Sequence, residues 1–167
     1  MNSIDILAIC MIVTSLAVFG LRNLKLSIGI YAIQTLLLVS IFFMLYSNFN
    51  APQLRIWAIV AFFTKVIFVP GILFWLVKKL DVISEDEPVG GFFVSPVIAM
   101  GFSLAIAMTI NPILLQFSLI QERIVLIAAV TVFMMGIFGF MLRNSFIKQI
   151  LAYCLFENGI HLSLALM

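Results

Sequence analysis

Charged side chains are scarce in this sequence. Lys, Arg, Asp and Glu make up 10% of its 167 residues and hydrophobic residues make up 65%, whereas soluble globular proteins carry about 25% charged residues. The mean hydropathy is +1.28. The net charge of +2 gives no reason to expect a nucleic-acid partner. The scarcity of charge excludes an ordinary soluble domain and indicates that lipid is the surrounding solvent.

Residues that bind metals and cofactors are also scarce. The chain has one His and two Cys, too few and too dispersed for a haem, iron–sulfur or zinc site of the usual ligand count. It has no Gly-rich phosphate loop, and no catalytic triad can be assembled. We therefore expect no cofactor in this chain and no catalysis by it alone. Cys10 and Cys154 lie in apolar runs, and we expect them to be small core residues without a disulfide.

The sequence is rich in apolar runs. Each run is about 20 residues long, enough to cross a bilayer as a helix, and a helix satisfies its own backbone hydrogen bonds in lipid. We predict an all-α, polytopic membrane protein that forms a single integral membrane domain over residues 1–167. Six spans are expected, at residues 4–21, 26–46, 54–77, 92–110, 124–142 and 146–167.

The distribution of Lys and Arg predicts the orientation. The loops after the first, third and fifth spans carry six of these residues, and the other side carries two, Arg55 and Arg123. Because Lys and Arg concentrate in cytoplasmic loops, we expect the polar loop at residues 78–91 to be cytoplasmic and the N-terminus to lie outside. We expect the acidic residues of that loop to be solvated, with a docking surface for a soluble partner as the alternative. They are Asp81, Glu85, Asp86 and Glu87.

The two ends of the chain carry weaker signals. Asp5 stands where a signal peptide would have a basic flank, so we expect a retained first helix. The triplet "LRN" precedes both the second and the sixth span, which suggests an internal repeat. A complete repeat would place a seventh span after Met167, so we expect the natural chain to be longer.

Two ionisable residues lie near the centres of predicted spans, Lys65 in the third and Glu157 in the sixth. A lone charge at that depth costs about 2.5–3.5 kcal/mol on insertion scales. It must pair, lose its charge or sit in a hydrated cavity, and each of these outcomes suits proton handling. The sequence leaves open whether the two side chains touch. It also leaves open a structural role in which they fix helix packing.

Further polar residues follow the same spans. Gln149, Tyr153, Glu157 and His161 are spaced by four, so they share one slowly turning helical face. All four could act on a proton path, but interhelical hydrogen bonding and packing explain Gln149 and Tyr153 as well. The second span has a matching uncharged face, formed by Ser27, Tyr31, Gln34 and Thr35.

Proline and glycine mark special backbone positions. Pro70 cannot donate a hydrogen bond to the carbonyl of Val66, which predicts a kinked and locally polar backbone beside Lys65. Gly136 and Gly139 are expected to allow close packing of helices.

Three sequence blocks resemble successive parts of a known family. They are "LSIGIYAIQTLLLVSIFF", "IWAIVAFFTKVIFVPGIL" and "RNSFIKQILAYCLFENGIHLSLAL", and "TK…VP" and "ENG.H" are their most specific elements. They are similar to hydrogenase-4 component E, a membrane subunit of group 4 nickel–iron hydrogenase and formate hydrogenlyase-type complexes. The portion at residues 124–167 is similar to the K subunit of respiratory complex I, which carries membrane-embedded glutamates on its proton path.

The resemblance implies a cofactor-free subunit of a redox-coupled proton-translocating complex in the bacterial cytoplasmic membrane. It implies a proton-path role for Glu157, whereas Lys65 and His161 fall in family blocks without an assigned role. The implied partners are antiporter-like and quinone-site-like membrane subunits and peripheral hydrogenase subunits that hold nickel–iron and iron–sulfur centres. The candidate proton-path residues are Glu157, Lys65, His161, Tyr153, Gln149 and Gln34.

The sequence leaves two rival functions open. The chain could be a subunit of a multisubunit cation/proton antiporter, which also contains small complex I-like proteins. It could also be a membrane scaffold whose buried polar groups only hold the helices together.

Overall fold

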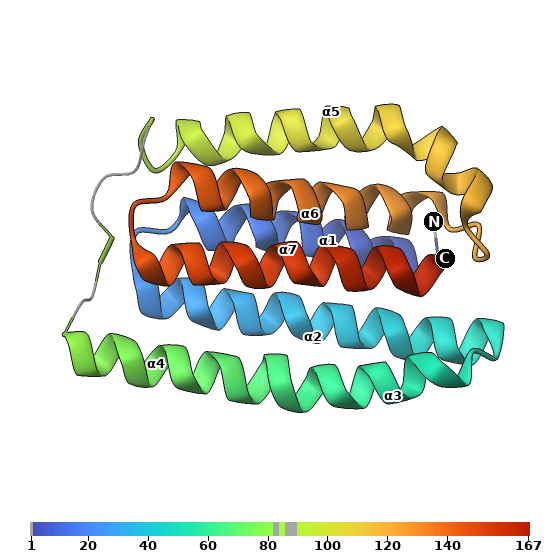
Figure 1. Ribbon diagram of the computed structural model, residues 1–167, viewed down its shortest axis with the longest axis horizontal. Helices are drawn as coiled ribbons and strands as arrows, with labels where there is room; N and C mark the ends of the chain where they lie inside the picture. The colour runs from blue at the N-terminus through green and yellow to red at the C-terminus, as the bar shows by residue number, and fades with distance from the viewer. Residues whose placement is uncertain (1, 82–83, 86–89) are drawn as a thin grey trace.

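The computed structural model describes residues 2–81, 84–85 and 90–167, and helices account for most of them (Figure 1). The segments α3, η1 and α4 follow one another without a break and form a single long span. The described chain thus contains six helical spans, and the all-α prediction is confirmed. The bounds are α1 Ser3–Gly20, α2 Leu24–Phe49, α3 Pro52–Ala61, η1 Phe62–Phe68, α4 Val69–Leu80, α5 Val94–Phe117, α6 Arg123–Leu142 and α7 Phe146–Leu166.

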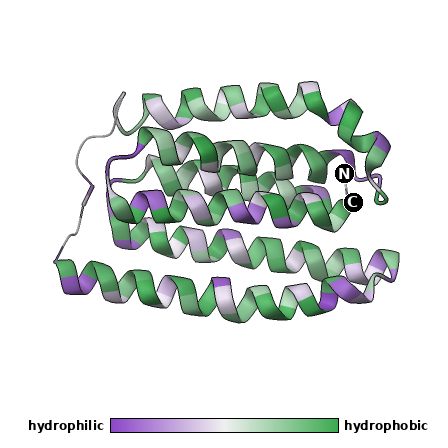
Figure 2. Ribbon diagram, in the orientation of Figure 1, coloured by the Kyte–Doolittle hydropathy of each residue, from purple (hydrophilic) through white to green (hydrophobic). Residues whose placement is uncertain are grey.

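Five of the spans in the described chain are long and apolar enough to cross a membrane, and α7 is not among them. Helix α7 has 21 residues and lies alongside the other helices (Figure 1), but its internal polar residues lower its hydropathy. Polar residues otherwise gather toward the ends of the bundle, and apolar residues cover its sides (Figure 2). Large apolar side chains such as Phe63, Phe68 and Phe102 are more than half exposed on these sides. The chain is therefore a multi-pass helical membrane protein.

The central layer of the bundle is formed by α1, α2, α6 and α7, which contact one another. Helix α5 packs on α6 and α1, and the α3–α4 span packs along α2. These two outer elements lie on opposite sides of the central helices, and the two chain ends lie at the same end of the bundle (Figure 1). Helix α7 is consequently surrounded by protein on several sides, which gives its polar residues partners.

Glycines bring the central helices unusually close together. A Cβ atom at Gly136 of α6 would overlap the backbone of Phe156 in α7, and one at Gly159 of α7 would overlap the backbone of Phe133 in α6. A Cβ atom at Gly139 would overlap the ring of Phe19 in α1. The prediction of close packing at Gly136 and Gly139 is confirmed. Gly159, which the sequence analysis did not single out, does the same from the other side.

The fourth span ends later than predicted. The predicted span ended at residue 110, where an Asn-Pro pair follows, a pair that commonly marks a loop. Instead α5 continues to Phe117 with Pro112 inside it, and its last turns bend away from the rest of the helix (Figure 1). Neighbouring polar groups let membrane helices tolerate a proline. Asn111, which precedes the proline, donates its side-chain amide to the backbone oxygen of Arg123 at 3.4 Å and so joins the bend to the start of α6.

Candidate functional site

A change of helix type places Lys65 at the centre of the bundle. The segment η1 is a π-helix, and the Val69 N–H donates to the backbone oxygen of Thr64, five residues earlier. Pro70 follows immediately at the start of α4 and offers no N–H of its own. The predicted irregularity next to Pro70 is therefore a π-helical turn that contains Lys65. Such turns are rare and occur frequently at functional sites.

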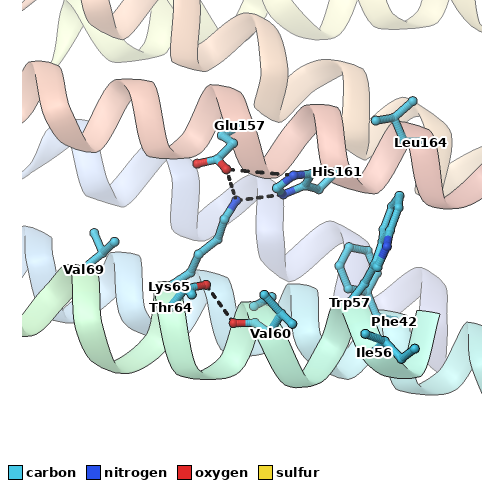
Figure 3. A pocket seen from close by; sticks show the side chains of 11 residues that line it. Phe42, Ile56, Trp57, Val60, Thr64, Lys65, Val69, Glu157, His161 and Leu164 are labelled. Carbon is cyan, nitrogen blue, oxygen red and sulfur yellow. Dashed lines mark hydrogen bonds and ion pairs between the residues drawn. The ribbon is translucent and has the colours of Figure 1, made fainter. Parts of the chain in front are cut away.

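The Lys65 ammonium nitrogen meets three side chains from α7, of which Glu157 and His161 are drawn in Figure 3. It lies 2.9 Å from Asn158 Oδ1, 2.9 Å from His161 Nδ1 and 3.3 Å from Glu157 Oε1. Lys65 is 6% exposed, so these three groups replace most of its hydration. The contact between Lys65 and Glu157, which the sequence left open, is present.

The three ionisable members of this cluster can exchange a proton. Because a lysine ammonium only donates, the short contact makes His161 Nδ1 the acceptor and leaves the imidazole proton on Nε2. His161 Nε2 is 3.9 Å from Glu157 Oε1, which is too long for a direct hydrogen bond. The proton can therefore reside on Lys65, Glu157 or His161 with only small movements of the side chains.

Asn158 ties this cluster to the second helix. Its Nδ2 donates to Gln34 Oε1 at 2.9 Å and to Thr35 Oγ1 at 3.2 Å. Gln34 Nε2 in turn lies 3.5 Å from Ser15 Oγ in α1. Asn158, Gln34 and Thr35 are fully buried, so the network is a polar core within an apolar bundle.

Sequence reasoning found part of this network. It named Gln34 as a candidate and noted the uncharged polar face of the second span. It missed Asn158, because a stripe traced at four-residue spacing passes through Glu157 and His161 and omits the residue beside them. The signal was available, since Asn158 is the central letter of the "ENG" element.

A cavity of about 770 Å³ opens beside the cluster. Its walls come from α2, the α3–α4 span and α7, and its polar end is formed by Lys65, Glu157 and His161 (Figure 3). The Glu157 and His161 side chains are 38% and 36% exposed, in contrast to Lys65. The cluster thus has a buried side, toward Asn158, and an accessible side, toward the cavity.

The other two members of the predicted stripe lie elsewhere. Tyr153 is 59% exposed, and its ring stacks on Phe156 at a centroid distance of 6.2 Å. Gln149 Nε2 donates to the backbone oxygen of Arg143 at 2.9 Å and so satisfies the end of α6. The structure does not bring either residue to Lys65.

A second charged cluster lies where α1, α6 and the polar loop meet. Arg143 pairs with Glu85 at 3.1 Å and donates to the Phe19 backbone oxygen at 2.6 Å. Lys148 donates to the Val18 backbone oxygen, to the Leu21 backbone oxygen at 2.8 Å and to Ser27 Oγ at 2.7 Å. The two cations therefore satisfy carbonyl groups at the C-terminal end of α1, which favours positive charge.

This cluster corrects the prediction of a solvated acidic loop for Glu85, whereas Asp81 is exposed as predicted. Glu85 is 2% exposed, and its N–H donates to the backbone oxygen of Arg22 at 3.1 Å. Burial raises the pKa of the Glu85 carboxyl, against the opposing effect of the Arg143 and Lys148 charges. Asp86, which was also predicted to be solvated, lies outside the described residues. So does Glu87.

Within the described parts of the chain, no cluster of three or more His, Cys, Asp or Glu side chains could hold a metal ion. Both cysteines are free, with Cys154 buried and Cys10 exposed. The prediction of a small core residue is confirmed for Cys154 and wrong for Cys10, which lies on the outer face of α1.

The fold and the site define a class: a polytopic helical membrane protein with a lysine, a glutamate and a histidine in contact inside the bundle. No protein-family model matches the chain, and no solved structure matches it. Hydrogenase-4 component E of Escherichia coli K12, of E. coli O157:H7 and of Shigella flexneri is 35% identical over 161 residues. The alignment covers 96% of this chain and 74% of each relative. The chain belongs to the hydrogenase-4 component E family, as the three sequence blocks predicted.

Proposed function

We propose that this chain is a cofactor-free membrane subunit of a hydrogenase-4-type complex and contributes to redox-coupled proton translocation and to assembly of the membrane arm. Membership of the hydrogenase-4 component E family supports the complex. The observation that carries the proton role is the placement of Lys65 Nζ within 3.3 Å of Glu157 and 2.9 Å of His161. Ionisable residues inside a membrane are rare and mark functional sites, among which proton relays are one kind.

The contacts support a stepwise transfer. With Lys65 charged and Glu157 ionised, the two form an ion pair. A proton that arrives on Glu157 removes this attraction, because a neutral carboxyl no longer stabilises the ammonium. Lys65 then passes a proton to His161 Nδ1 across 2.9 Å, and His161 releases its Nε2 proton toward the cavity. Electron transfer in other subunits would provide the free energy.

The same proposal includes the surroundings of the chain. The partners would be antiporter-like and quinone-site-like membrane subunits together with peripheral subunits that hold the nickel–iron and iron–sulfur centres. The complex would lie in the bacterial cytoplasmic membrane, with the end that carries Arg143 and Lys148 in the cytoplasm. The excess of Lys and Arg at that end supports the orientation.

The test is proton uptake by inverted membrane vesicles that carry Glu157→Gln. Turnover is driven by the electron donor of the complex, and uptake is normalised to hydrogen evolved and to assembled complex. We expect uptake per hydrogen to fall to about one tenth or less, since the amide cannot take up a proton. Tyr153→Phe is the matched control, because it lies one turn away on the same helix without contact to Lys65, and it should leave uptake unchanged.

A scaffold function is the second candidate, and the hydrogen bonds of Asn158 favour it. Asn158 links α7 to Lys65, Gln34 and Thr35, as expected of a residue that fixes helix packing. Unchanged uptake per hydrogen in Glu157→Gln, with normal assembly, would refute the proton role and support the scaffold. Co-purification without any hydrogenase subunit, together with a response to sodium, would instead support an antiporter.

A further inference from the structure

A second cavity lies between the Lys65 site and one end of the bundle. Its volume is about 340 Å³, and it is formed around the turn from α2 to α3 and the end of α7. Gln53, in the first turn of α3, is a polar residue of its wall. The central cavity and this second cavity have two wall residues in common, Trp57 and Leu164.

Trp57 and Leu164 stand on facing helices. Trp57 belongs to α3 and Leu164 to α7, and the indole ring extends from α3 toward α7 (Figure 3). The ring packs edge-on against Phe42 at a centroid distance of 6.4 Å and lies 6.2 Å from the ring of His161. Eight residues separate Trp57 from Lys65, which corresponds to about 12 Å along a helix.

Trp57 and Leu164 matter because they lie between the two cavities, on a route by which water could approach the site. The sides of the bundle carry exposed apolar side chains, so a lateral opening of the central cavity meets hydrocarbon, which contains no water. Along the bundle, the second cavity places a route for water at the end where α3 begins. On that route it passes from the second cavity to Glu157 and His161 between Trp57 and Leu164.

We propose that Trp57 and Leu164 form a hydrophobic gate that controls water access to the Lys65–Glu157–His161 site from this end of the bundle. Apolar constrictions gate other membrane pathways by excluding water. Trp57 touches the site through His161, so a shift of the imidazole on protonation would move the indole and open the route. The role of this gate in proton transfer rests on the proposed proton function. Its effect as a barrier to water can be measured without turnover of the complex.

Thiol accessibility tests the barrier in membranes that contain the assembled complex. In a background with Cys10→Ala and Cys154→Ala, Val60→Cys reports the central cavity and Gln53→Cys reports the second cavity. A membrane-impermeant cationic methanethiosulfonate is added to the side on which Gln53→Cys reacts. We expect Val60→Cys to react slowly, because a thiol without water rarely ionises to the reactive thiolate.

Opening the gate should change the rate of thiol modification in the central cavity and not the rate in the second cavity. Trp57→Ala should raise the Val60→Cys rate about tenfold, because water then supports the thiolate, and should leave the Gln53→Cys rate unchanged. Leu164→Ala should act in the same direction and keeps the test valid if Trp57→Ala does not assemble. Ile56→Ala is the matched control, because Ile56 lines the central cavity but not the second cavity, and it should have no effect.

Two results would overturn the gate. One is a Val60→Cys rate as fast as the Gln53→Cys rate with Trp57 and Leu164 intact. The other is a Val60→Cys rate that neither alanine variant raises in an assembled complex. Neither result depends on proton uptake, so a failure of the gate and a failure of the proton role of Glu157 remain distinguishable.

Discussion

Lys65 and Lys148 are both buried lysines, but their ammonium groups have different hydrogen-bond acceptors. Lys65 contacts a carboxylate, an imidazole and an amide, and two of these face a cavity. Lys148 contacts backbone carbonyls of α1 and the Ser27 hydroxyl, and it is fully enclosed. The first set includes groups that titrate, whereas the second offers only acceptors that hold no extra proton.

The same residue type therefore serves two purposes in one bundle. Lys148, with Arg143, closes the end of α1, where unpaired carbonyls would otherwise be buried at a cost of about 1–3 kcal/mol each. Lys65 closes no helix end. Two of its partners on α7, Glu157 and His161, are more than a third exposed, and only Asn158 Oδ1 is a buried acceptor that depends on it. The surroundings of a buried charge, and not its burial alone, indicate whether it stabilises the fold or handles protons.

The largest effect on stability is expected for Lys148→Met. The change leaves the Val18 and Leu21 carbonyls and the Ser27 hydroxyl without their donor, and we expect a loss of about 3–5 kcal/mol in the free energy of unfolding. Chemical unfolding in detergent and the level of assembled complex in membranes measure it. Lys65→Met is the matched control and should cost less, about 1–2 kcal/mol, because it leaves one buried acceptor, Asn158 Oδ1, without its donor. Equal losses for the two variants would contradict the comparison.

A smaller effect is expected at the carboxylates. Glu85→Gln leaves the buried Arg143 guanidinium without its counter-charge, and we expect it to lower the free energy of unfolding by about 1–3 kcal/mol. Glu157→Gln, whose side chain is partly exposed, should cost less than half as much. The same unfolding experiment compares the two variants directly. A greater loss for Glu157→Gln would show that the central cluster is the structural one.

The smallest effect is expected for Gln149→Met. It removes one side-chain hydrogen bond to the Arg143 carbonyl, worth about 0.5–1.5 kcal/mol, and it lies outside the Lys65 cluster. Proton uptake per hydrogen evolved should equal that of the wild type. A marked loss of uptake in an assembled complex would return Gln149 to the proton path on which the four-residue spacing first placed it.

Much of the site could be predicted from the sequence, and its limits have a physical origin. Lys65, Glu157, His161 and Gln34 were identified because polar residues inside apolar runs are costly and stand out. Tyr153 and Gln149 were placed with them by helical spacing alone. A face traced at four-residue spacing turns slowly around the helix, so Gln149 and Tyr153, one to three turns before Glu157 and His161, face other neighbours than Lys65.

Other features depend on helices that are distant in the chain. Asn158 matters because α2 and the η1 segment present Gln34, Thr35 and Lys65 to it. Glu85 is buried because the ends of α1 and α6 offer it Arg143 and the backbone of Arg22. No local pattern reports such partners. The same holds for Trp57, which is one apolar residue among many until a second cavity is found behind it.

The apolar runs of about 20 residues by themselves determined that this protein is a bundle of membrane helices, because a helix of that length crosses the bilayer and satisfies its own backbone hydrogen bonds in lipid. The sequence also determined which residues would need an explanation inside that bundle. Only the tertiary structure decided which of them meet, since contacts such as Lys65 to Glu157 and Arg143 to Glu85 join segments far apart in the chain. The energy of a charge in a low-dielectric interior depends on its neighbours within a few ångströms. Those neighbours are set by how the helices pack.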